Sequence, residues 1–361
     1  MKNRRIFLSC GDPSGDFHAA RLVPELRKRN AVVHALGGRR TEAAGAELLE
    51  NIVKESVVGF WESLKKFGYY RGVLEKTKKY LTRNPADALL LVDFWGFNSH
   101  LGEWAGKRGI PVYYYISPQV WASREGRAER IKRWVRKMFV VFPFEEDFYR
   151  KKGIPVRFVG HPLLDVVPPP LDALPQKVSV GVLPGSRNQE VKSLFPLFCE
   201  LCGRLRRDFT GSEFFLFAHP DIDWSEIEIP GYFTKVSSDE FYEKRRELLF
   251  ALTASGTATL ENTLLGIPMA VFYRLSFFTY QLARRLVRVP YIGMPNILSG
   301  KLLVPEFIQH LDPELIYPVL KKNIENRAGL TGIREELLKL RGSLGRPGVA
   351  ERVAGCLLDD L

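Results

Sequence analysis

A turn in the second half of the sequence carries groups that suit phosphate binding. An apolar run ends at residue 183 and is followed by Gly185, Ser186 and Arg187, after which a helical pattern begins. Backbone N–H groups at a helix start, a hydroxyl and a guanidinium all favour an anion. Such a turn is, taken singly, as often a plain connection between a strand and a helix.

A second turn of the same kind follows an apolar run that ends near residue 254. It contains Ser255, Gly256 and Thr257, and Glu261 lies one helical turn further on, on the same helix face as Thr257. Together the two turns supply donors for a diphosphate and an acceptor for ribose hydroxyls. The pair of turns therefore predicts a nucleotide site.

A single acid, Asp93, directly follows the apolar residues 89–92 and precedes Phe94 and Trp95. Burial against a strand end and two aromatic rings raises the pKa of a carboxyl toward the range that suits a general base. A plain helix-capping role for Asp93 is the alternative interpretation.

The elements that must position these groups alternate along the whole chain. Strand patterns are expected at residues 4–10, 32–36, 88–92, 112–116, 138–142, 157–159, 178–183, 214–218, 233–236, 249–252 and 269–272. Helical patterns separate them, which predicts right-handed βαβ units and an α/β fold of two doubly wound parallel-sheet, Rossmann-like domains that face each other across a cleft.

A proline cluster at residues 166–175 interrupts the alternation and is expected to be a stiff linker. We therefore expect a first domain over residues 1–167 and a second over residues 168–345. Residues 346–361 are expected to form a C-terminal helix that can pack back on the first domain.

The composition is that of a globular protein, with 361 residues of which 45% are hydrophobic. No apolar run approaches 18 residues and the chain enters a strand pattern near residue 4, so we expect a cytoplasmic protein. The four scattered cysteines, two of them at Cys199 and Cys202 within a helical pattern, indicate reduced thiols rather than a disulfide framework or a metal site.

The net charge of +12 is concentrated in residues 61–83, 124–137 and 274–288. The first of these segments also contains Trp61, Phe67, Tyr69 and Tyr70. Cations beside aromatic rings on a helix suit an anionic membrane surface, and these four aromatics are the expected membrane and acyl-chain contacts. Nucleic acid and an ordinary core face with a basic rim are the competing interpretations.

The motifs, in their order, resemble the lipid-A-disaccharide synthases, a family of inverting glycosyltransferases with the GT-B fold. The matching segments are residues 11–16, 37–38, 44–45, 58–62, 93 with 97–98, 115–122, 142–149, 158–162, 183–191, 254–261 and 289–306. They extend over most of the chain.

The resemblance implies a reaction between two acylated sugars. UDP-2,3-diacylglucosamine would donate its glucosamine unit to the 6-hydroxyl of 2,3-diacylglucosamine 1-phosphate, giving a β-1,6-linked disaccharide 1-phosphate and UDP. It also implies that no metal or other cofactor is needed, that nucleic acid is not a partner, and that the enzyme works at the inner face of the inner membrane. It leaves a homodimer open.

The resemblance also assigns residues to roles. Asp93 would be the base and Arg187 would stabilise the leaving diphosphate. The UDP-sugar would be bound by Gly185, Ser186, Arg187, Ser255, Gly256, Thr257, Glu261 and Asn296. The acceptor would be bound by Asp12, Ser14, Gly15, Asn98 and Gln119.

Three positions depart from the family pattern. Asp12-Pro13 stands where Glu is more usual, Gly96 replaces a second Asp, and Ser123 replaces a second Trp. They concern acceptor placement and acyl-chain preference rather than the reaction class.

Another enzyme that uses UDP-N-acetylglucosamine, such as the undecaprenyl-linked transferase or a 2-epimerase, is the nearest alternative function. A nucleic-acid-binding protein is the more distant one.

Overall fold

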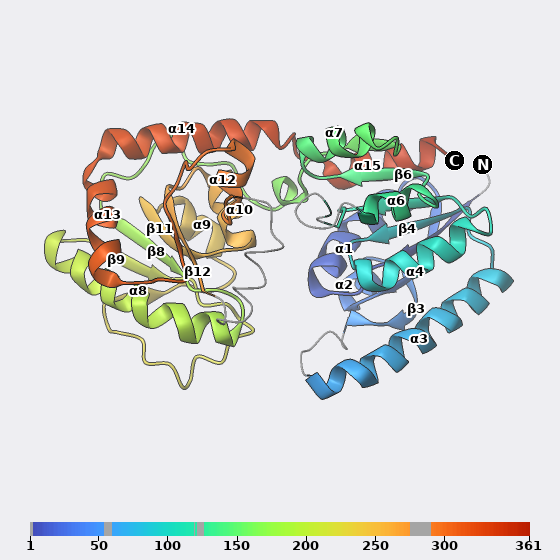
Figure 1. Ribbon diagram of the computed structural model, residues 1–361, viewed down its shortest axis with the longest axis horizontal. Helices are drawn as coiled ribbons and strands as arrows, with labels where there is room; N and C mark the ends of the chain where they lie inside the picture. The colour runs from blue at the N-terminus through green and yellow to red at the C-terminus, as the bar shows by residue number, and fades with distance from the viewer. Residues whose placement is uncertain (1–2, 54–59, 119, 121–125, 275–289) are drawn as a thin grey trace. The chain divides into compact units, whose positions relative to one another are not determined.

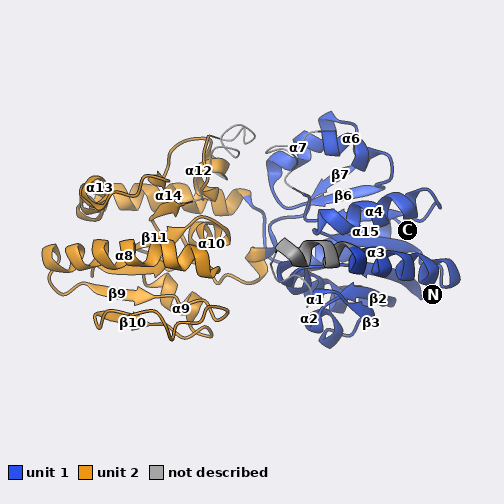
Figure 2. Cartoon of the chain, turned by 60° about the horizontal axis from the view of Figure 1, so that its bottom comes forward, with its two compact units in different colours: residues 1–162, 344–361 blue, residues 163–343 orange. Residues whose placement is uncertain are grey.

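The computed structural model describes residues 3–53, 60–118, 120, 126–274 and 290–361, and the side chains of residues 60–67 lie outside the description. The chain divides into two compact units, one made of residues 1–162 and 344–361 and the other of residues 163–343 (Figure 2). Each unit is a parallel sheet with helices on both faces, so the predicted α/β fold of two doubly wound domains is confirmed. The proline cluster at residues 166–175 lies within the second unit.

The sheet of unit 1 has seven parallel strands in the order β3-β2-β1-β4-β5-β6-β7. The strands are β1 (Arg4–Ser9), β2 (Ala31–Gly37), β3 (Glu47–Asn51), β4 (Ala88–Val92), β5 (Val112–Tyr115), β6 (Lys137–Val140) and β7 (Val156–Phe158). Every residue of the central strands β4 and β5 is buried, as expected for strands covered on both faces.

Seven helices of unit 1 are described, and the chain's last helix is one of them. They are α1 (Pro13–Arg27), α2 (Arg39–Ala43), α3 (Phe60–Arg83), α4 (Trp95–Gly106), α6 (Gly126–Lys132), α7 (Pro143–Lys151) and α15 (Val349–Asp359). Residues of α3, α4 and α6 share one core with the sheet, whereas α15 packs beside α1 (Figure 1). Asp360 anchors α15 by accepting hydrogen bonds from Lys137 Nζ at 2.5 Å and from Arg136 Nε and Tyr113 Oη at 2.8 Å.

Unit 2 repeats the plan with six parallel strands in the order β10-β9-β8-β11-β12-β13. Its strands are β8 (Ser179–Leu183), β9 (Glu213–Leu216), β10 (Phe233–Lys235), β11 (Phe250–Ala254), β12 (Met269–Tyr273) and β13 (Glu306–Ile308). Its helices are α8 (Asn188–Asp208), α9 (Phe241–Arg246), α10 (Thr257–Leu265), α12 (Met294–Ser299), α13 (Pro313–Glu325) and α14 (Arg327–Ser343).

The helices of unit 2 cover the two faces of its sheet. Apolar residues of α8 and α13 form one core with β8, β9, β11 and β12, and α10 packs against α14 on the other side (Figure 1). All four cysteines are free thiols, and burial raises the pKa of Cys199 to about 11. Among the helices described, none combines the length and the apolar character that crossing a membrane requires.

Both sheets reverse their direction of winding at one pair of neighbouring strands. The reversal lies between β1 and β4 in unit 1 and between β8 and β11 in unit 2. In open parallel sheets the loops at such a point leave toward opposite faces, and ligands bind outside the carboxyl ends of the strands there. The loops after these four strands are therefore the first places to look for a site.

Candidate active site

Two predicted residues, Asp12 and Asp93, lie at the reversal point of unit 1. Asp12 follows β1 and Asp93 follows β4, and these strands pair directly in the sheet. Asp12 caps α1, because its Oδ1 accepts a hydrogen bond from Gly15 N at 2.6 Å. The negative charge of Asp12 also lies close enough to raise the pKa of Asp93.

The backbone at Asp93 is held in an unusual conformation. Asp93 has φ 45° and Phe94 has φ 50°, so two successive non-glycine residues occupy the left-handed region. Three hydrogen bonds fix Asp93: its N donates to Tyr115 O at 3.0 Å, and its O accepts from Tyr114 Oη at 2.6 Å and Asn98 Nδ2 at 2.8 Å. The conformation of the loop that carries the carboxylate is therefore fixed by its neighbours.

The neighbouring loop must lack a side chain for this bend to fit. A Cβ at Gly11 would lie 2.1 Å from the ring of Phe94.

The environment of Asp93 makes its carboxyl a weaker acid. Burial has the larger effect and the charge of Asp12 the smaller, and together they raise the pKa of Asp93 to about 6. A carboxyl with that pKa is deprotonated near neutral pH and is still basic enough to take a proton from a hydroxyl.

The other residues expected to bind the acceptor differ in their accessibility. Ser14 is exposed on the first turn of α1, whereas Gly15 is buried below it. Asn98 is fully buried: its Nδ2 donates to the backbone oxygens of Ser9 and Asp93, and its Oδ1 accepts from Ser9 Oγ at 2.7 Å. Asn98 therefore reaches an acceptor only through the Asp93 loop that it holds. Gln119 lies outside the described residues.

The aromatic residues of α3 fall into two groups. The side chains of Trp61 and Phe67 lie outside the description. Tyr69 and Tyr70 are half-buried, and Tyr69 Oη donates to Glu50 Oε1 at 3.2 Å. The ring of Tyr70 packs against Phe94 at 5.6 Å between centroids, so α3 contacts the loop that carries Asp93. Membrane contact by these aromatics stays a prediction.

The first predicted turn of unit 2 follows β8 and leads into α8. Gly185 has φ 119°, and a Cβ there would lie 2.5 Å from the Glu190 carboxylate, so this turn requires glycine. Ser186 and Arg187 are exposed. The Glu190 carboxylate accepts from Ser186 N at 3.2 Å and from Arg187 Nη1 at 2.7 Å. An anionic group thus already occupies the donors that were predicted to hold phosphate.

The second predicted turn follows β11 and leads into α10. Gly256 and Thr257 are exposed at the N-terminus of α10, and Gly256 has φ 140°. Ser255 Oγ donates to Ile292 O at 3.1 Å, which ties the turn to the loop before α12. The exposed backbone N–H groups and the helix N-terminus suit an anion.

Glu261 and Asn296 differ in how much of each side chain a ligand can reach. The Glu261 carboxylate is 16% exposed and accepts from Arg245 Nη1 and Tyr242 Oη, each at 2.7 Å. Asn296 is fully buried, and both its amide N–H groups and its carbonyl oxygen are engaged, with Val304, Glu306 and Leu303. The Asn296 side chain thus shapes the loop after α12 and leaves no donor for a sugar.

Two features of this site had no clear signal in the sequence. Glu306 accepts hydrogen bonds from Ile292 N, Gly293 N and Asn296 Nδ2, and so fixes the loop beside Ser255. The matching segment that contains Glu306 was visible in the sequence, but its role was not. Arg245, the partner of Glu261, lies in no segment that the sequence analysis identified.

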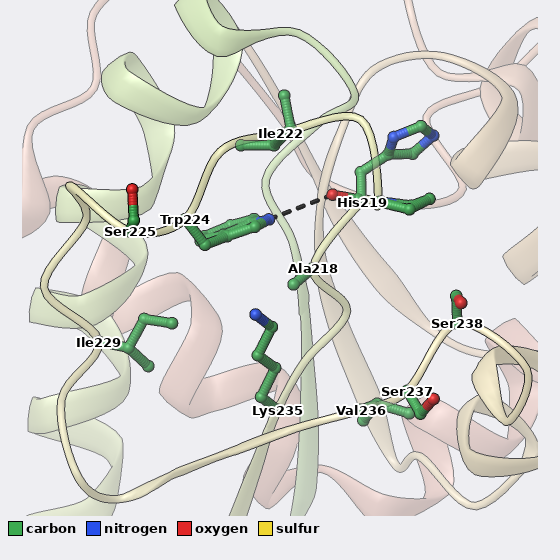
Figure 3. A pocket seen from close by; sticks show the side chains of 11 residues that line it. Ala218, His219, Ile222, Trp224, Ser225, Ile229, Lys235, Val236, Ser237 and Ser238 are labelled. Atoms are coloured by element: carbon green, nitrogen blue, oxygen red, sulfur yellow. Dashed lines mark hydrogen bonds between the residues drawn. The ribbon is translucent and has the colours of Figure 1, made fainter.

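A third feature that the sequence did not indicate is a cavity of about 480 Å³ at the carboxyl ends of β9 and β10 (Figure 3). Lys235 points toward its centre, and the Trp224 ring is held by a hydrogen bond from Nε1 to His219 O at 3.2 Å. The lining residues are Ala218, His219, Pro220, Ile222, Trp224, Ser225, Ile229, Lys235, Val236, Ser237 and Ser238. Apolar side chains and the polar His219, Lys235 and three serines line it together, a combination that can bind a small ligand.

A metal centre is not apparent in the part of the chain that the structure describes. No cluster of three or more His, Cys, Asp or Glu side chains there could hold an ion. Each unit holds candidate groups of its own: unit 1 has the Asp93 loop, and unit 2 has the turns after β8 and β11, Glu261 and the cavity.

Solved structures with this architecture define the class of protein. The chain is similar to MurG from Acinetobacter baumannii, at 13% identity and a TM-score of 0.64 over 99% of this chain and 100% of that one. It is also similar to a UDP-N-acetylglucosamine 2-epimerase, described as putative, from Listeria monocytogenes, at 11% identity and a TM-score of 0.68 over 99% and 97%. The chain therefore has the GT-B fold.

Sequence comparison narrows the class to one family. A family model described as lipid-A-disaccharide synthetase matches residues 6–339. Lipid-A-disaccharide synthases from Geobacter metallireducens and Coxiella burnetii are 38% and 33% identical to this chain, and each alignment covers 98% or more of both sequences. The chain belongs to the lipid-A-disaccharide synthase family, which confirms the resemblance inferred from its motifs.

Proposed function

We propose that this protein joins UDP-2,3-diacylglucosamine to 2,3-diacylglucosamine 1-phosphate, forming the β-1,6-linked disaccharide 1-phosphate and releasing UDP. The observation that carries the proposal is the family match over residues 6–339, which includes the Asp93 loop and both anion-binding turns. A carboxylate with a raised pKa and two exposed turns that suit phosphate are the groups that this reaction needs.

In the proposed reaction Asp93 takes the proton of the acceptor 6-hydroxyl. The hydroxyl oxygen then forms a bond to the anomeric carbon of the glucosamine, on the face opposite UDP, and the bond from that carbon to the diphosphate oxygen breaks. UDP leaves with the electron pair, so the configuration inverts. The exposed Arg187 side chain turns from Glu190 toward the diphosphate and, with the exposed N–H groups at the Gly256 turn, stabilises the charge that develops there.

The nucleoside is assigned to the rest of unit 2. Glu261 accepts hydrogen bonds from the ribose hydroxyls, for which its carboxylate still has free lone pairs. The uracil ring takes the cavity lined by Trp224 and Lys235. This assignment is supported by α9, which begins just after the cavity residue Ser238 and carries Tyr242, the residue that bonds to Glu261.

We also propose that the enzyme binds the anionic inner face of the inner membrane peripherally. Both substrates carry acyl chains, and burial of each methylene contributes about 0.8 kcal/mol. The basic and aromatic residues 61–83 are the proposed contact with lipid and acyl chains. Acceptor contacts through Asp12, Ser14 and Gln119 belong to the same proposal.

The function is tested by incubating the purified protein with both diacyl sugars and separating the products by thin-layer chromatography. We expect disaccharide 1-phosphate and UDP in equal amounts, formed faster on anionic than on zwitterionic vesicles. Conversion of UDP-N-acetylglucosamine without disaccharide formation would favour the alternative enzymes. Tight binding of nucleic acid with no affinity for UDP would reject the proposal altogether.

The pH dependence of the reaction should report on Asp93. Because its pKa is raised to about 6, kcat/KM is expected to fall about tenfold per unit below pH 6 as the base becomes protonated. Asp12→Asn removes a negative charge that raises this pKa but keeps an oxygen to cap α1. The fall of kcat/KM on the acidic side of the pH profile should therefore occur at lower pH in Asp12→Asn than in the wild type.

The phosphate of the acceptor also titrates in this pH range. Because both proteins are measured with the same substrates, its effect is the same in both profiles and cancels in the comparison. The measurement is the pH profile of kcat/KM between pH 4.5 and 8. An acid limb that stays in place or moves to higher pH in Asp12→Asn would show that Asp93 does not set it.

A further inference from the structure

The buried guanidinium of Arg245 is bound almost entirely to one turn of α10. Its side chain is only 3% exposed. Nη1 donates to Glu261 Oε2 at 2.7 Å, Nη2 donates to Ala258 O at 3.1 Å and to Asn262 Oδ1 at 2.7 Å, and Nε donates to the same Asn262 oxygen at 3.2 Å. Arg245 thus connects α9 to the first half of the helix that carries Glu261.

Glu261 is held from a second side by the same short helix. Tyr242 Oη donates to Glu261 Oε1 at 2.7 Å, so each carboxylate oxygen has one fixed donor. A glutamate side chain in solution samples many rotamers and loses that freedom when it binds a ligand. Because Tyr242 and Arg245 fix the Glu261 carboxylate, its rotamer freedom is already lost before a ligand binds. The carboxylate oxygens still have lone pairs that can accept a hydrogen bond from a ligand hydroxyl.

Joining α9 to α10 does not by itself require Arg245. Burying a guanidinium carries a large desolvation penalty, whereas burying an apolar side chain of similar size is favourable, and an apolar residue could join the two helices as well. Arg334 offers a comparison, because it is 5% exposed and binds the opposite end of α10 through Leu265 O and Gly266 O at 3.4 and 2.9 Å. Arg334 contacts no predicted ligand-binding side chain.

We propose that Arg245 is a positioning residue that fixes Glu261 and thereby sets how strongly the enzyme distinguishes ribose from deoxyribose. The inference rests on the proposed function, since it takes Glu261 as the acceptor for the ribose hydroxyls. It adds a residue from α9 whose effect on the nucleotide is exerted through the carboxylate and not by direct contact.

The test compares the affinities of UDP and 2′,3′-dideoxy-UDP by calorimetry for the wild type, Arg245→Met, Arg245→Lys and Arg334→Met. A hydrogen bond to a charged group predicts that the wild type prefers UDP by about 10-fold to 100-fold. Arg245→Met should reduce this ratio to near 1 and raise KM for the UDP-sugar more than it lowers kcat. Arg334→Met should lower the melting temperature and leave the ratio unchanged.

Arg245→Lys keeps the charge but lacks the planar fork, so we expect it to fold and to retain only part of the preference. If Arg245→Met does not fold, the ratio of UDP to dideoxy-UDP affinity in Arg245→Lys tests the inference in its place. An unchanged ratio in a folded Arg245 variant overturns the inference, as does an equal loss in Arg334→Met. If the wild type itself binds UDP without preferring it to the dideoxy analogue, the ribose assignment to Glu261 fails instead.

Discussion

Replacing Asp93 by Asn is expected to reduce kcat by about 10²-fold to 10⁴-fold, the usual contribution of a general base. Asn is the right substitution because it adopts the left-handed backbone at φ 45° readily and fills nearly the same volume. The affinity for UDP should not change, since the nucleotide is assigned to residues of unit 2. The measurement is single-turnover formation of the disaccharide, with UDP binding followed by calorimetry.

The same substitution should make the protein more stable near neutral pH. The folded protein holds the pKa of Asp93 at about 6, above its ordinary value of 3.8, so the unfolded chain releases this proton more readily. Wild-type stability therefore falls as pH rises from about 4 to about 6, and the loss persists above pH 6. Asp93→Asn removes this loss, about 1–3 kcal/mol from the size of the pKa difference.

Denaturant unfolding of both proteins at pH 4 and pH 8 checks the sign. The gain should be present at pH 8 and nearly absent at pH 4. Asp147→Asn is the matched control, because Asp147 is an exposed acid of the same unit whose side chain is 70% exposed. Near-normal turnover in Asp93→Asn would refute the assigned base, and reduced stability at pH 8 would refute the burial argument.

The sequence predicted the sheets well where strands are buried on both faces. The apolar runs near residues 88–92 and 249–252 correspond to β4 and β11 in the sheet centres. The edge strands β3 and β13 were missed, because no residue of either strand is fully buried and each contains charged or polar residues. The edge strands β7 and β10 also lack a buried residue, but each is followed directly by a buried valine, Val159 or Val236, which completes an apolar pattern that the sequence analysis could detect.

The sequence placed the site residues at strand ends but could not say where each side chain points. Asn98 and Asn296 lie in the first turns of α4 and α12, and both are fully buried and bond to the backbone around them. An amide can bind a sugar or its own loop equally well, and only the surrounding carbonyl and N–H groups decide between them. Arg245 went unnoticed because its partner lies 16 residues away on another helix.

Arg187→Ala should lower kcat by about 10²-fold to 10³-fold, as expected when one preorganised donor to a developing charge is removed. The Arg187 side chain is 79% exposed and forms an ion pair with Glu190. Such exposed ion pairs contribute only about 0–1 kcal/mol to folding, so the guanidinium can turn toward a diphosphate at little cost. For the same reason, the variant should unfold at nearly the wild-type denaturant concentration.

Arg207→Ala is the matched control for this experiment, because Arg207 is an exposed arginine at the opposite end of the same helix, α8. Loss of activity in Arg187→Ala but not in Arg207→Ala would assign the effect to the turn after β8 and not to net charge. Since the charge on the diphosphate grows as the sugar–oxygen bond breaks, kcat should fall more than the affinity for UDP does. A loss of UDP affinity with kcat unchanged, or activity within about threefold of the wild type, would mean that Arg187 does not stabilise the leaving group and that the Gly256 turn does so without it.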